Sequence, residues 1–183
     1  MSEELKIVFT GPMGAGKTTA IAAISDVPPI LTDAVNNDRA AFDKESTTVA
    51  LDYGQLHLND GINVRLYGTP GQDRFAFMRR ILCDGAIGIV LLLDGSRDDA
   101  TEQLESYLRD LLALKPLPVV VIGVGRCRSP DQPILRKLSA LLESKHLNMP
   151  VFGVDVRRRQ DVFLLVETLV CMLEVTANFE ATK

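Results

Sequence analysis

The sequence predicts an α/β protein in which helices cover a mostly parallel sheet, with one antiparallel hairpin at the edge of that sheet. Two patterns support this fold class. Short apolar segments alternate along the chain with amphipathic segments of helical period. In addition, two consecutive strand-like segments are separated by Asn59-Asp60-Gly61, and an Asp-Gly pair is typical of tight hairpin turns. The 183 residues contain no evident repeat or linker, so we expect residues 1–183 to form one domain.

The first half of the chain contains the hairpin. Leu5–Thr10 is short and apolar, which predicts a strand. Lys17–Ser25 predicts a helix that ends before Pro28, because a proline disfavours helical geometry in the preceding residue. Residues 29–46 are polar and without period, and a long loop of this kind in a compact domain is usually functional or disordered. The two predicted hairpin strands are Thr47–Leu58 and Ile62–Tyr67.

The second half alternates buried strands with helices. Three continuous apolar runs are typical of strands buried on both faces: Ala86–Leu93, Pro118–Val124 and Pro150–Val154. Apolar residues at helical spacing predict three helices that each pack one face on the sheet: Leu104, Leu108, Leu111 and Leu112; Leu135, Leu138, Leu141 and Leu142; Leu165, Leu169, Met172 and Leu173. In such sheets ligands bind beyond the carboxyl ends of the strands.

Composition excludes several classes of protein. A net charge of −4 gives no overall attraction to nucleic acid or anionic lipid. Cys83, Cys127 and Cys171 have neither metal-ligand spacing nor the even number of a disulfide framework, so we expect reduced, mostly buried thiols. Neither a signal peptide, nor a myristoylation or prenylation motif, nor a membrane-length apolar run is present. We therefore expect a cytoplasmic protein that reaches a membrane only through a partner.

The clearest motif is a phosphate-binding loop. Gly11-Pro12-Met13-Gly14-Ala15-Gly16-Lys17-Thr18 matches G-x-x-x-x-G-K-[ST] at every fixed position, between a predicted strand and a predicted helix. The glycines allow backbone N–H groups to converge on a phosphate, and the helix N-terminus adds positive potential. Lys17 supplies a full charge to the β- and γ-phosphates, and the Thr18 hydroxyl is a Mg²⁺ ligand. We expect the phosphates of a nucleotide to contact Gly11, Gly14, Ala15, Gly16, Lys17, Thr18 and Thr19.

Further segments indicate which class of P-loop protein this is. With the P-loop, Ser46-Thr47-Thr48, Gly68-Thr69-Pro70-Gly71-Gln72 and Asp155-Val156-Arg157 make essentially the whole chain resemble the Ras-like small GTPases. It looks closest to the bacterial branch of the Mgl gliding-motility GTPases and the GTPases encoded in actinobacterial conservons. The resemblance implies a three-layer P-loop NTPase fold, the Ras-like G domain, and a switch that binds GTP or GDP with Mg²⁺ and slowly hydrolyses the triphosphate.

The resemblance also implies roles for single residues. Thr48 resembles the threonine that binds Mg²⁺ when the γ-phosphate is present, with Thr47 as a rival shifted by one residue; both also suit an ordinary strand edge. Gly71 resembles the glycine whose N–H senses the γ-phosphate, although Pro70-Gly71 also suits an ordinary turn. Gln72 resembles the glutamine that orients the attacking water.

One departure from the family concerns the metal. Gly68 stands where the family has an aspartate that contacts Mg²⁺ through water. If Asp60-Gly61 is a two-residue turn, Asn59 pairs with Ile62 and Asp52 lies opposite Thr69, near the metal. Asp52 is therefore a candidate substitute, and the alternative is a solvated strand carboxylate.

A second departure concerns the base. Gly125-Arg126-Cys127-Arg128 stands where the family has Asn-Lys-x-Asp, and Arg128 has only donors where the family aspartate accepts hydrogen bonds from guanine. Base specificity is therefore open, and ATP is not excluded. Arg126, Arg128 and Asp155 are the residues that we expect at the base, although the segment around Asp155 also suits a solvated loop before a helix capped by Asp161.

A third departure is the absence of the arginine that the Mgl branch has before Thr48, where this chain has Thr47. Arg39 and Arg74 are candidates for an arginine finger, and each also suits an ordinary solvated arginine.

Two rival functions remain: a nucleotide-binding scaffold that no longer hydrolyses, and a P-loop small-molecule kinase. No lid-like insertion rich in arginine supports the kinase.

The resemblance implies a protein partner as well. This is a Roadblock-type activator or effector in a surface-motility or signalling system, which we expect to bind over the hairpin and Asp73–Leu82. Phe75 and Phe77 point to different sides if this segment is helical, so one of them should be partly exposed. The alternative is that both aromatic side chains pack inside.

Overall fold

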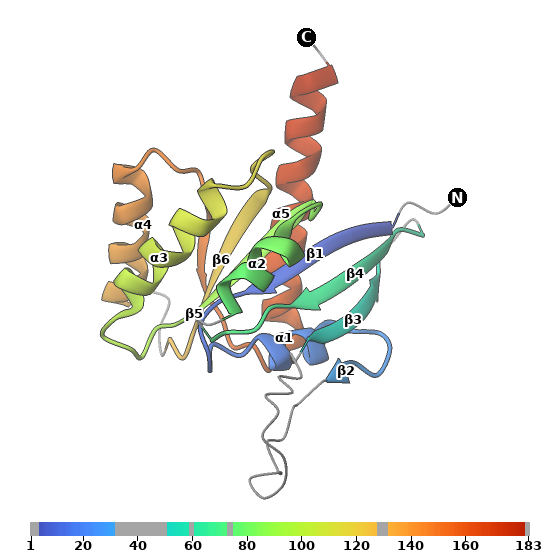
Figure 1. Cartoon of the computed structure of the whole chain (residues 1–183), viewed down its shortest axis with the longest axis horizontal. Helices are drawn as coiled ribbons and strands as arrows, with labels where there is room; N and C mark the ends of the chain where they lie inside the picture. Colours follow the sequence, from blue (N-terminus) through green and yellow to red (C-terminus); the bar gives the residue numbers. More distant parts are fainter. Residues whose placement is uncertain (1–3, 32–50, 59–60, 73–74, 128–131, 182–183) are drawn as a thin grey trace, which may run out of the picture.

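The computed structural model describes residues 4–31, 51–58, 61–72, 75–127 and 132–181. Within these residues seven strands form one sheet in the order β2-β3-β4-β1-β5-β6-β7 (Figure 1). The pairs β1–β4, β1–β5, β5–β6 and β6–β7 are parallel, whereas β2–β3 and β3–β4 are antiparallel. The strands are β1 (Glu4–Thr10), β2 (Ile30–Leu31), β3 (Asp52–His57), β4 (Asn63–Gly68), β5 (Gly88–Asp94), β6 (Val119–Gly125) and β7 (Val151–Gly153).

Helices cover both faces of the sheet, which confirms the predicted three-layer α/β class. On one face α1 and α5 pack on Ile7, Phe9, Val90 and Leu92; on the other, α2, α3 and α4 lie over Val8, Ile89 and Leu91 (Figure 1). The alternation within β1 and β5 follows from the opposite directions of successive side chains in a strand. The helices are α1 (Lys17–Ile24), α2 (Ala76–Cys83), α3 (Ala100–Leu112), α4 (Pro133–Ser144) and α5 (Arg159–Ala181). None of the helices in the described ranges combines the length and apolar character needed to cross a bilayer.

The predicted hairpin forms, but two details of the prediction were wrong. Asp52 pairs with Gly68 rather than with Thr69, and the Leu58 N–H donates to the Ile62 carbonyl over 3.0 Å. Three residues therefore separate Leu58 from Ile62 at the turn, rather than the two that were predicted for it, so every cross-strand pair of β3 and β4 shifts by one position. The hairpin is also not the edge of the sheet, because β2 pairs with the outer side of β3.

Other boundaries and burial predictions differ locally. Helix α1 ends at Ile24, and Ser25 is extended. Asp161 does not cap α5 but lies in its first turn, where its Oδ2 accepts a hydrogen bond from the Asp155 N–H over 2.8 Å.

Leu112 is 43% exposed and lies off the packed face of α3. Cys83 is buried, but Cys127 is half-buried and Cys171 is exposed, so the prediction of mostly buried thiols was wrong.

Candidate functional site

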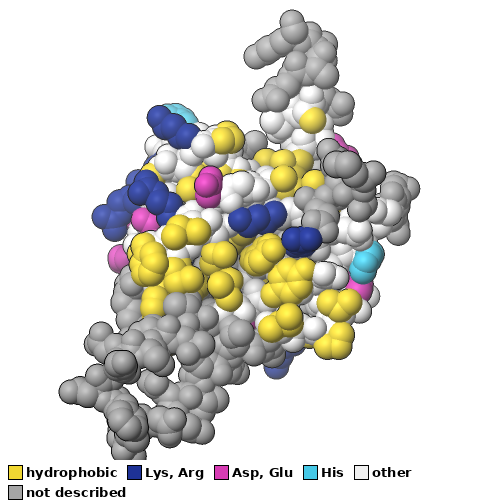
Figure 2. Space-filling model, turned by 45° about the vertical axis from the view of Figure 1, so that its right-hand side comes forward, with side chains coloured by type: hydrophobic (Ala, Val, Ile, Leu, Met, Phe, Trp, Pro, Cys, Tyr) yellow, Lys and Arg dark blue, Asp and Glu magenta, His cyan; other side chains and the backbone are white. Residues whose placement is uncertain are grey.

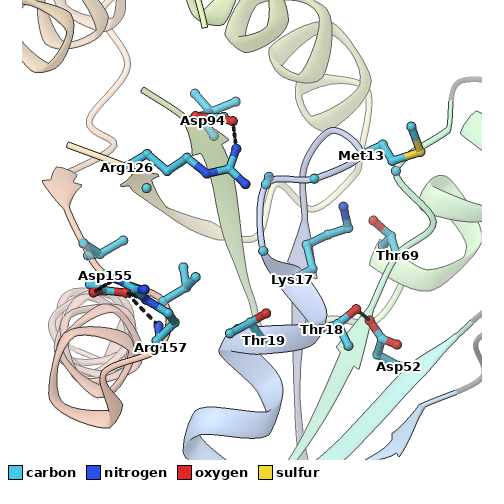
Figure 3. A pocket seen from close by; sticks show the side chains of 18 of the residues that line it. Met13, Lys17, Thr18, Thr19, Asp52, Thr69, Asp94, Arg126, Asp155 and Arg157 are labelled. Atoms are coloured by element: carbon cyan, nitrogen blue, oxygen red, sulfur yellow. Dashed lines mark hydrogen bonds and ion pairs between the residues drawn. The ribbon is translucent and has the colours of Figure 1, made fainter. Parts of the chain in front are cut away.

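A cleft of about 840 Å³ opens at the carboxyl ends of the parallel strands, where a ligand site is expected in this class of sheet (Figure 3). Its walls come from the loop after β1, the start of β3, the segment after β4, the ends of β5 and β6, and the loop before α5. The cleft therefore brings together the P-loop, the metal-site candidate Asp52 and the base-end candidates Arg126 and Asp155.

Glycine geometry shapes the P-loop. Gly11 has φ 140°, and a Cβ there would lie 2.0 Å from the Leu92 carbonyl oxygen, so only glycine allows β1 to turn this close to β5. Gly16 has φ 94° and is the N-cap of α1. The first-turn N–H groups of that helix thus face the cleft, as anion binding requires. Ala15 is buried and Gly14 has φ 81°, while Thr19 also lines the cleft.

Lys17 provides the positive charge at the centre of the loop. Its side chain is almost fully buried, and its Nζ donates to the carbonyl oxygens of Gly11 at 2.7 Å and Pro12 at 2.8 Å. Burial lowers the pKa of Lys17 to about 8; the negative charge of Asp52 opposes this shift, and the positive charge of Arg79 adds to it. An ammonium group held in this way is ready to exchange loop carbonyls for phosphate oxygens.

Thr18 and Asp52 form an oxygen-rich corner beside Lys17. The Thr18 hydroxyl donates to Asp52 Oδ2 over 2.6 Å, and Asp52 is only 9% exposed (Figure 3). A Cβ at Gly68 would lie 2.9 Å from the Asp52 Cβ. The carboxylate therefore uses space that a side chain at position 68 would fill. Hydroxyl and carboxylate oxygens are the ligands that Mg²⁺ prefers, so these residues fit a Mg²⁺ site.

The segment after β4 lies directly against the P-loop. A Cβ at Gly71 would lie 2.5 Å from the Met13 nitrogen, so the two backbones are in close contact there. The hydroxyls of Thr69 and Thr10 are 2.9 Å apart and share a buried hydrogen bond, which ties this segment to the end of β1. Gln72 follows at once and is exposed. The geometry thus places Gly71 in the cleft wall against the P-loop, whereas Gln72 is not among the residues that line the cleft.

At the opposite end of the cleft, an aspartate and an arginine pair across two strand ends. Arg126 Nη1 donates to Asp94 Oδ2 (Figure 3). Asp94 Oδ1 accepts two further hydrogen bonds, from the Ser96 N–H at 3.0 Å and the Ser96 hydroxyl at 2.6 Å. Burial alone would raise the pKa of Asp94, but the bonds from Ser96 and the charge of Arg126 outweigh it and lower the pKa below its usual value.

A second pair of the same kind stands in the loop before α5. Arg157 donates from Nε to Asp155 Oδ1 at 2.8 Å and from Nη2 to Oδ2 at 2.7 Å. Hydrogen bonds from the Arg157 side chain lower the pKa of Asp155 to about 2. Val156 packs against the P-loop, because a Cβ at Gly16 would lie 2.8 Å from its Cγ2. Asp155 therefore does line the cleft, but with its carboxylate held by an arginine.

The cleft also contains a residue that the sequence analysis missed. Asp94 ends the buried strand β5 at the edge of the sheet where ligands bind, and a search for polar residues at that position would have found it. Five candidates lie outside the described residues: Thr47, Thr48, Arg128, Arg39 and Arg74.

Comparison with known proteins agrees with this geometry. A family described as "conserved hypothetical ATP binding protein" matches residues 29–123, just over half of the chain, in a stretch that begins after the P-loop. GTP-binding protein ypt4 of Schizosaccharomyces pombe is 30% identical over 128 residues, which cover 66% of this chain and 50% of that protein. An uncharacterized protein of Methanocaldococcus jannaschii is 31% identical over 116 residues, covering 63% of this chain and 66% of its own length.

A more distant relative aligns over more of the chain. Ras-related protein Rab-27A of Sus scrofa is 22% identical over 185 residues, which cover 92% of this chain and 78% of its own length. By contrast, the chain spans about half the length of ypt4 and of the Arabidopsis thaliana protein RABA1f. The chain belongs to the family of conserved hypothetical ATP-binding proteins, and it is similar to GTP-binding and Ras-related proteins of the small-GTPase type.

Proposed function

We propose that residues 1–183 form one domain that acts as a molecular switch, binding a nucleoside triphosphate with Mg²⁺ and hydrolysing it slowly. The observation that carries this proposal is the arrangement of Lys17 and the Thr18–Asp52 pair within one cleft, next to Gly71. Lys17 supplies a positive charge for the phosphates, Thr18 and Asp52 supply oxygen ligands for a metal, and Gly71 supplies an N–H that senses the γ-phosphate. These groups follow one another along the chain in the same order as in Ras-like proteins.

Each residue has a distinct part in the proposed reaction. Lys17 binds the β- and γ-phosphate oxygens, and Gln72 orients the attacking water. Gly71, and Thr48 by resemblance, respond to the presence of the γ-phosphate. Mg²⁺, held by Thr18 and supported by Asp52, would neutralise charge on the phosphates. Loss of the γ-phosphate then releases the segments around Thr48 and Gly71, which is the basis of a switch.

The nucleotide is proposed as GTP or GDP on the strength of the relatives, with ATP as the alternative that the family description supports. A titration of the protein with GTP, GDP, ATP and ADP, each with Mg²⁺, tests this directly. Lys17→Ala should abolish tight triphosphate binding, because it removes the buried ammonium group from the loop. Unchanged triphosphate affinity in this variant would remove the basis of the proposal.

A second function, a nucleotide-binding scaffold without hydrolysis, is favoured by the glycine at position 68. The family's aspartate is absent there, and the carboxylate that contacts the Thr18 hydroxyl, Asp52, comes from another strand. A single-turnover assay of bound triphosphate separates the two functions. Release of phosphate without any acceptor molecule supports the switch and also excludes a small-molecule kinase.

The proposed partner is a Roadblock-type activator or effector, and the proposed setting is a cytoplasmic signalling or motility system of the bacterial Mgl or conservon kind. Helix α2 exposes Phe77 at 62% and Ile81 at 66%. Beyond the end of this helix, Lys6 donates to the Asp84 carbonyl and lies over the Tyr67 ring, and Tyr67 contacts Tyr53. Figure 2 shows hydrophobic side chains gathered across this face, with basic side chains beside them. An apolar surface next to the phosphate sensor suits a state-dependent partner.

A further inference from the structure

Helix α1 and strand β3 run side by side away from the cleft and are joined at both ends. At the cleft end, the Thr18 hydroxyl donates to Asp52 over 2.6 Å. At the far end, the Gln55 N–H donates to the Ser25 hydroxyl oxygen at 3.1 Å, and the Gln55 carbonyl accepts from the Asp26 N–H at 2.7 Å. Between these contacts, seven residues of helix (18 to 25) and three of strand (52 to 55) each rise about 10 Å, so both sets of bonds form at once.

Two glycines allow α1 to lie directly against the hairpin between these ends. A Cβ at Gly54 would lie 2.8 Å from Ile21 Cγ2 and 2.9 Å from Ser25 Oγ. A Cβ at Gly68 would lie 3.0 Å from Ile21 Cδ1. Closely packed elements transmit displacement from one end to the other. A shift of β3 along α1 at the far end would therefore also move Asp52 relative to the cleft end of α1.

Asp26 is the residue that joins the most groups at the far end. Its Oδ2 accepts a hydrogen bond from the His57 N–H at 2.8 Å, so a side-chain oxygen takes the place of a neighbouring strand at this edge of β3. Its Oδ1 accepts from Arg159 Nη2 at 2.9 Å, and Arg159 Nη1 donates to the Ile24 carbonyl, at the end of α1, over 2.9 Å. The bonds from the His57 N–H and from Arg159 lower the pKa of Asp26 against the opposing effect of burial. The ionised Asp26 thus connects α1, β3 and α5.

We propose that Asp26 is a positioning residue for the metal corner: it fixes β3 lengthwise against α1 and so holds the Asp52 carboxylate beside the Thr18 hydroxyl. Asp26 does not line the cleft, so it acts through Asp52 and touches neither the nucleotide nor a metal. This inference rests on the proposed function, because it concerns the residue that supports Mg²⁺ in that function.

The test measures GTP and ATP affinity at a series of Mg²⁺ concentrations and in excess EDTA. Asp26→Ala removes the acceptor of the His57 N–H and should raise the Mg²⁺ concentration needed for tight binding by about three- to tenfold, the effect of losing one or two hydrogen bonds. Affinity in EDTA should match the parent, because the P-loop is unchanged. Asp26→Asn keeps an oxygen that can accept from the His57 N–H, so it should behave much more like the parent. Asp99→Ala is the matched control, because Asp99 pairs with Arg97 at the start of α3 and does not line the cleft.

A double variant separates positioning from a general loss of structure. In the Asp52→Gly background, Asp26→Ala should raise the Mg²⁺ requirement by less than about twofold, since its effect passes through Asp52. Hydrogen exchange of the His57 N–H should accelerate in Asp26→Ala, which shows that the contact at the far end is lost.

The inference is overturned by an equal shift in both backgrounds, by weaker binding of Asp26→Ala in EDTA, or by an Asp99→Ala shift as large as that of Asp26→Ala. If Asp52→Gly moves the Mg²⁺ curve and Asp26→Ala does not, the positioning role alone is wrong. If Asp52→Gly leaves the curve unmoved, or the parent binds no triphosphate, the metal corner or the proposed function itself fails, and the inference fails with it.

Discussion

Asp52 and Gly68 face each other across the β3–β4 hairpin, and the carboxylate of one occupies the space that a side chain on the other would need. A Cβ at position 68 would lie 2.9 Å from the Asp52 Cβ and 3.0 Å from its Oδ2. The same Oδ2 accepts the 2.6 Å hydrogen bond from Thr18. A carboxylate at this corner can thus come from either strand, but not from both at once.

The first prediction follows from this exchange. Asp52→Gly should raise the Mg²⁺ concentration needed for triphosphate binding by about 10- to 100-fold, the usual effect of losing an outer-shell carboxylate. Adding Gly68→Asp to that variant should recover much of the loss, because the new carboxylate enters the vacated space. Magnesium titrations of nucleotide affinity measure both effects. Asp98→Asn, which removes an exposed carboxylate outside the cleft, is the control. A titration curve that Asp52→Gly leaves unmoved would refute the metal-supporting role of Asp52.

The second prediction concerns pH and binding. Burial lowers the pKa of Lys17 to about 8, and the phosphates require its ammonium form. As the pH rises through this value, the free protein loses the proton that binding requires, so triphosphate affinity should fall by up to about tenfold per pH unit. The measurement is the Kd of the Mg²⁺–triphosphate complex across that range. An affinity that stays constant well above pH 8 would contradict this prediction.

The free energy of unfolding should also depend on the protonation of Lys17, but it should rise with pH where the triphosphate affinity falls. The pKa of about 8 in the folded protein lies below the ordinary lysine pKa of 10.5, so the unfolded chain holds more protons between these two values. The free energy of unfolding without nucleotide therefore gains a contribution that rises with pH across this window, because the cost of burying the charge disappears. Lys17→Met should remove that slope. Denaturant unfolding at several pH values compares the two proteins, and identical slopes would show that Lys17 does not titrate there.

The fourth prediction concerns hydrolysis. Gln72→Leu should slow single-turnover hydrolysis by about 10- to 1000-fold and leave triphosphate affinity nearly unchanged, because water positioning acts mainly in the transition state. Gln160→Leu, at an exposed glutamine in the first turn of α5 that does not line the cleft, controls for the change of residue type. If the parent hydrolyses and Gln72→Leu matches its rate, Gln72 has no catalytic role.

Several features of this site could be predicted from the sequence because local patterns determine them. The spacing of glycines around Lys17, between an apolar strand and a helix, is enough to predict the P-loop and its place at the end of β1. The hairpin register was not predictable in the same way. It depends on whether two or three residues form the turn after Leu58, and Asn59-Asp60-Gly61 is compatible with both.

The end of the cleft away from the Thr18–Asp52 corner was harder to predict, because it is built from long-range contacts. Asp94 and Arg126 are brought together only by the parallel pairing of β5 with β6, and no sequence motif marks Asp94. The start of α5 was misplaced for a related reason. Asp161 has the residue type of an N-cap, but its carboxylate instead binds the Asp155 N–H and helps to hold the loop that carries Arg157.

The last prediction concerns the partner surface. Phe77 is 62% exposed on α2, as expected for one of the two aromatic residues after Gln72, whereas Phe75 is half-buried. An exposed aromatic side chain on a helix that follows Gly71 is suited to a partner that distinguishes the triphosphate from the diphosphate state. Phe77→Ala should weaken binding of a Roadblock-type protein to the triphosphate-loaded form by about 2 kcal/mol, or thirtyfold. Leu117→Ala is the matched control, because Leu117 is an apolar residue that is 46% exposed and lies in the loop before β6 rather than on α2. Titrations of both loaded states measure the effect, and the parent should bind more tightly when it holds the triphosphate. Equal affinity in the two states, or equal losses in Phe77→Ala and Leu117→Ala, would show that α2 does not form a switch-dependent docking surface.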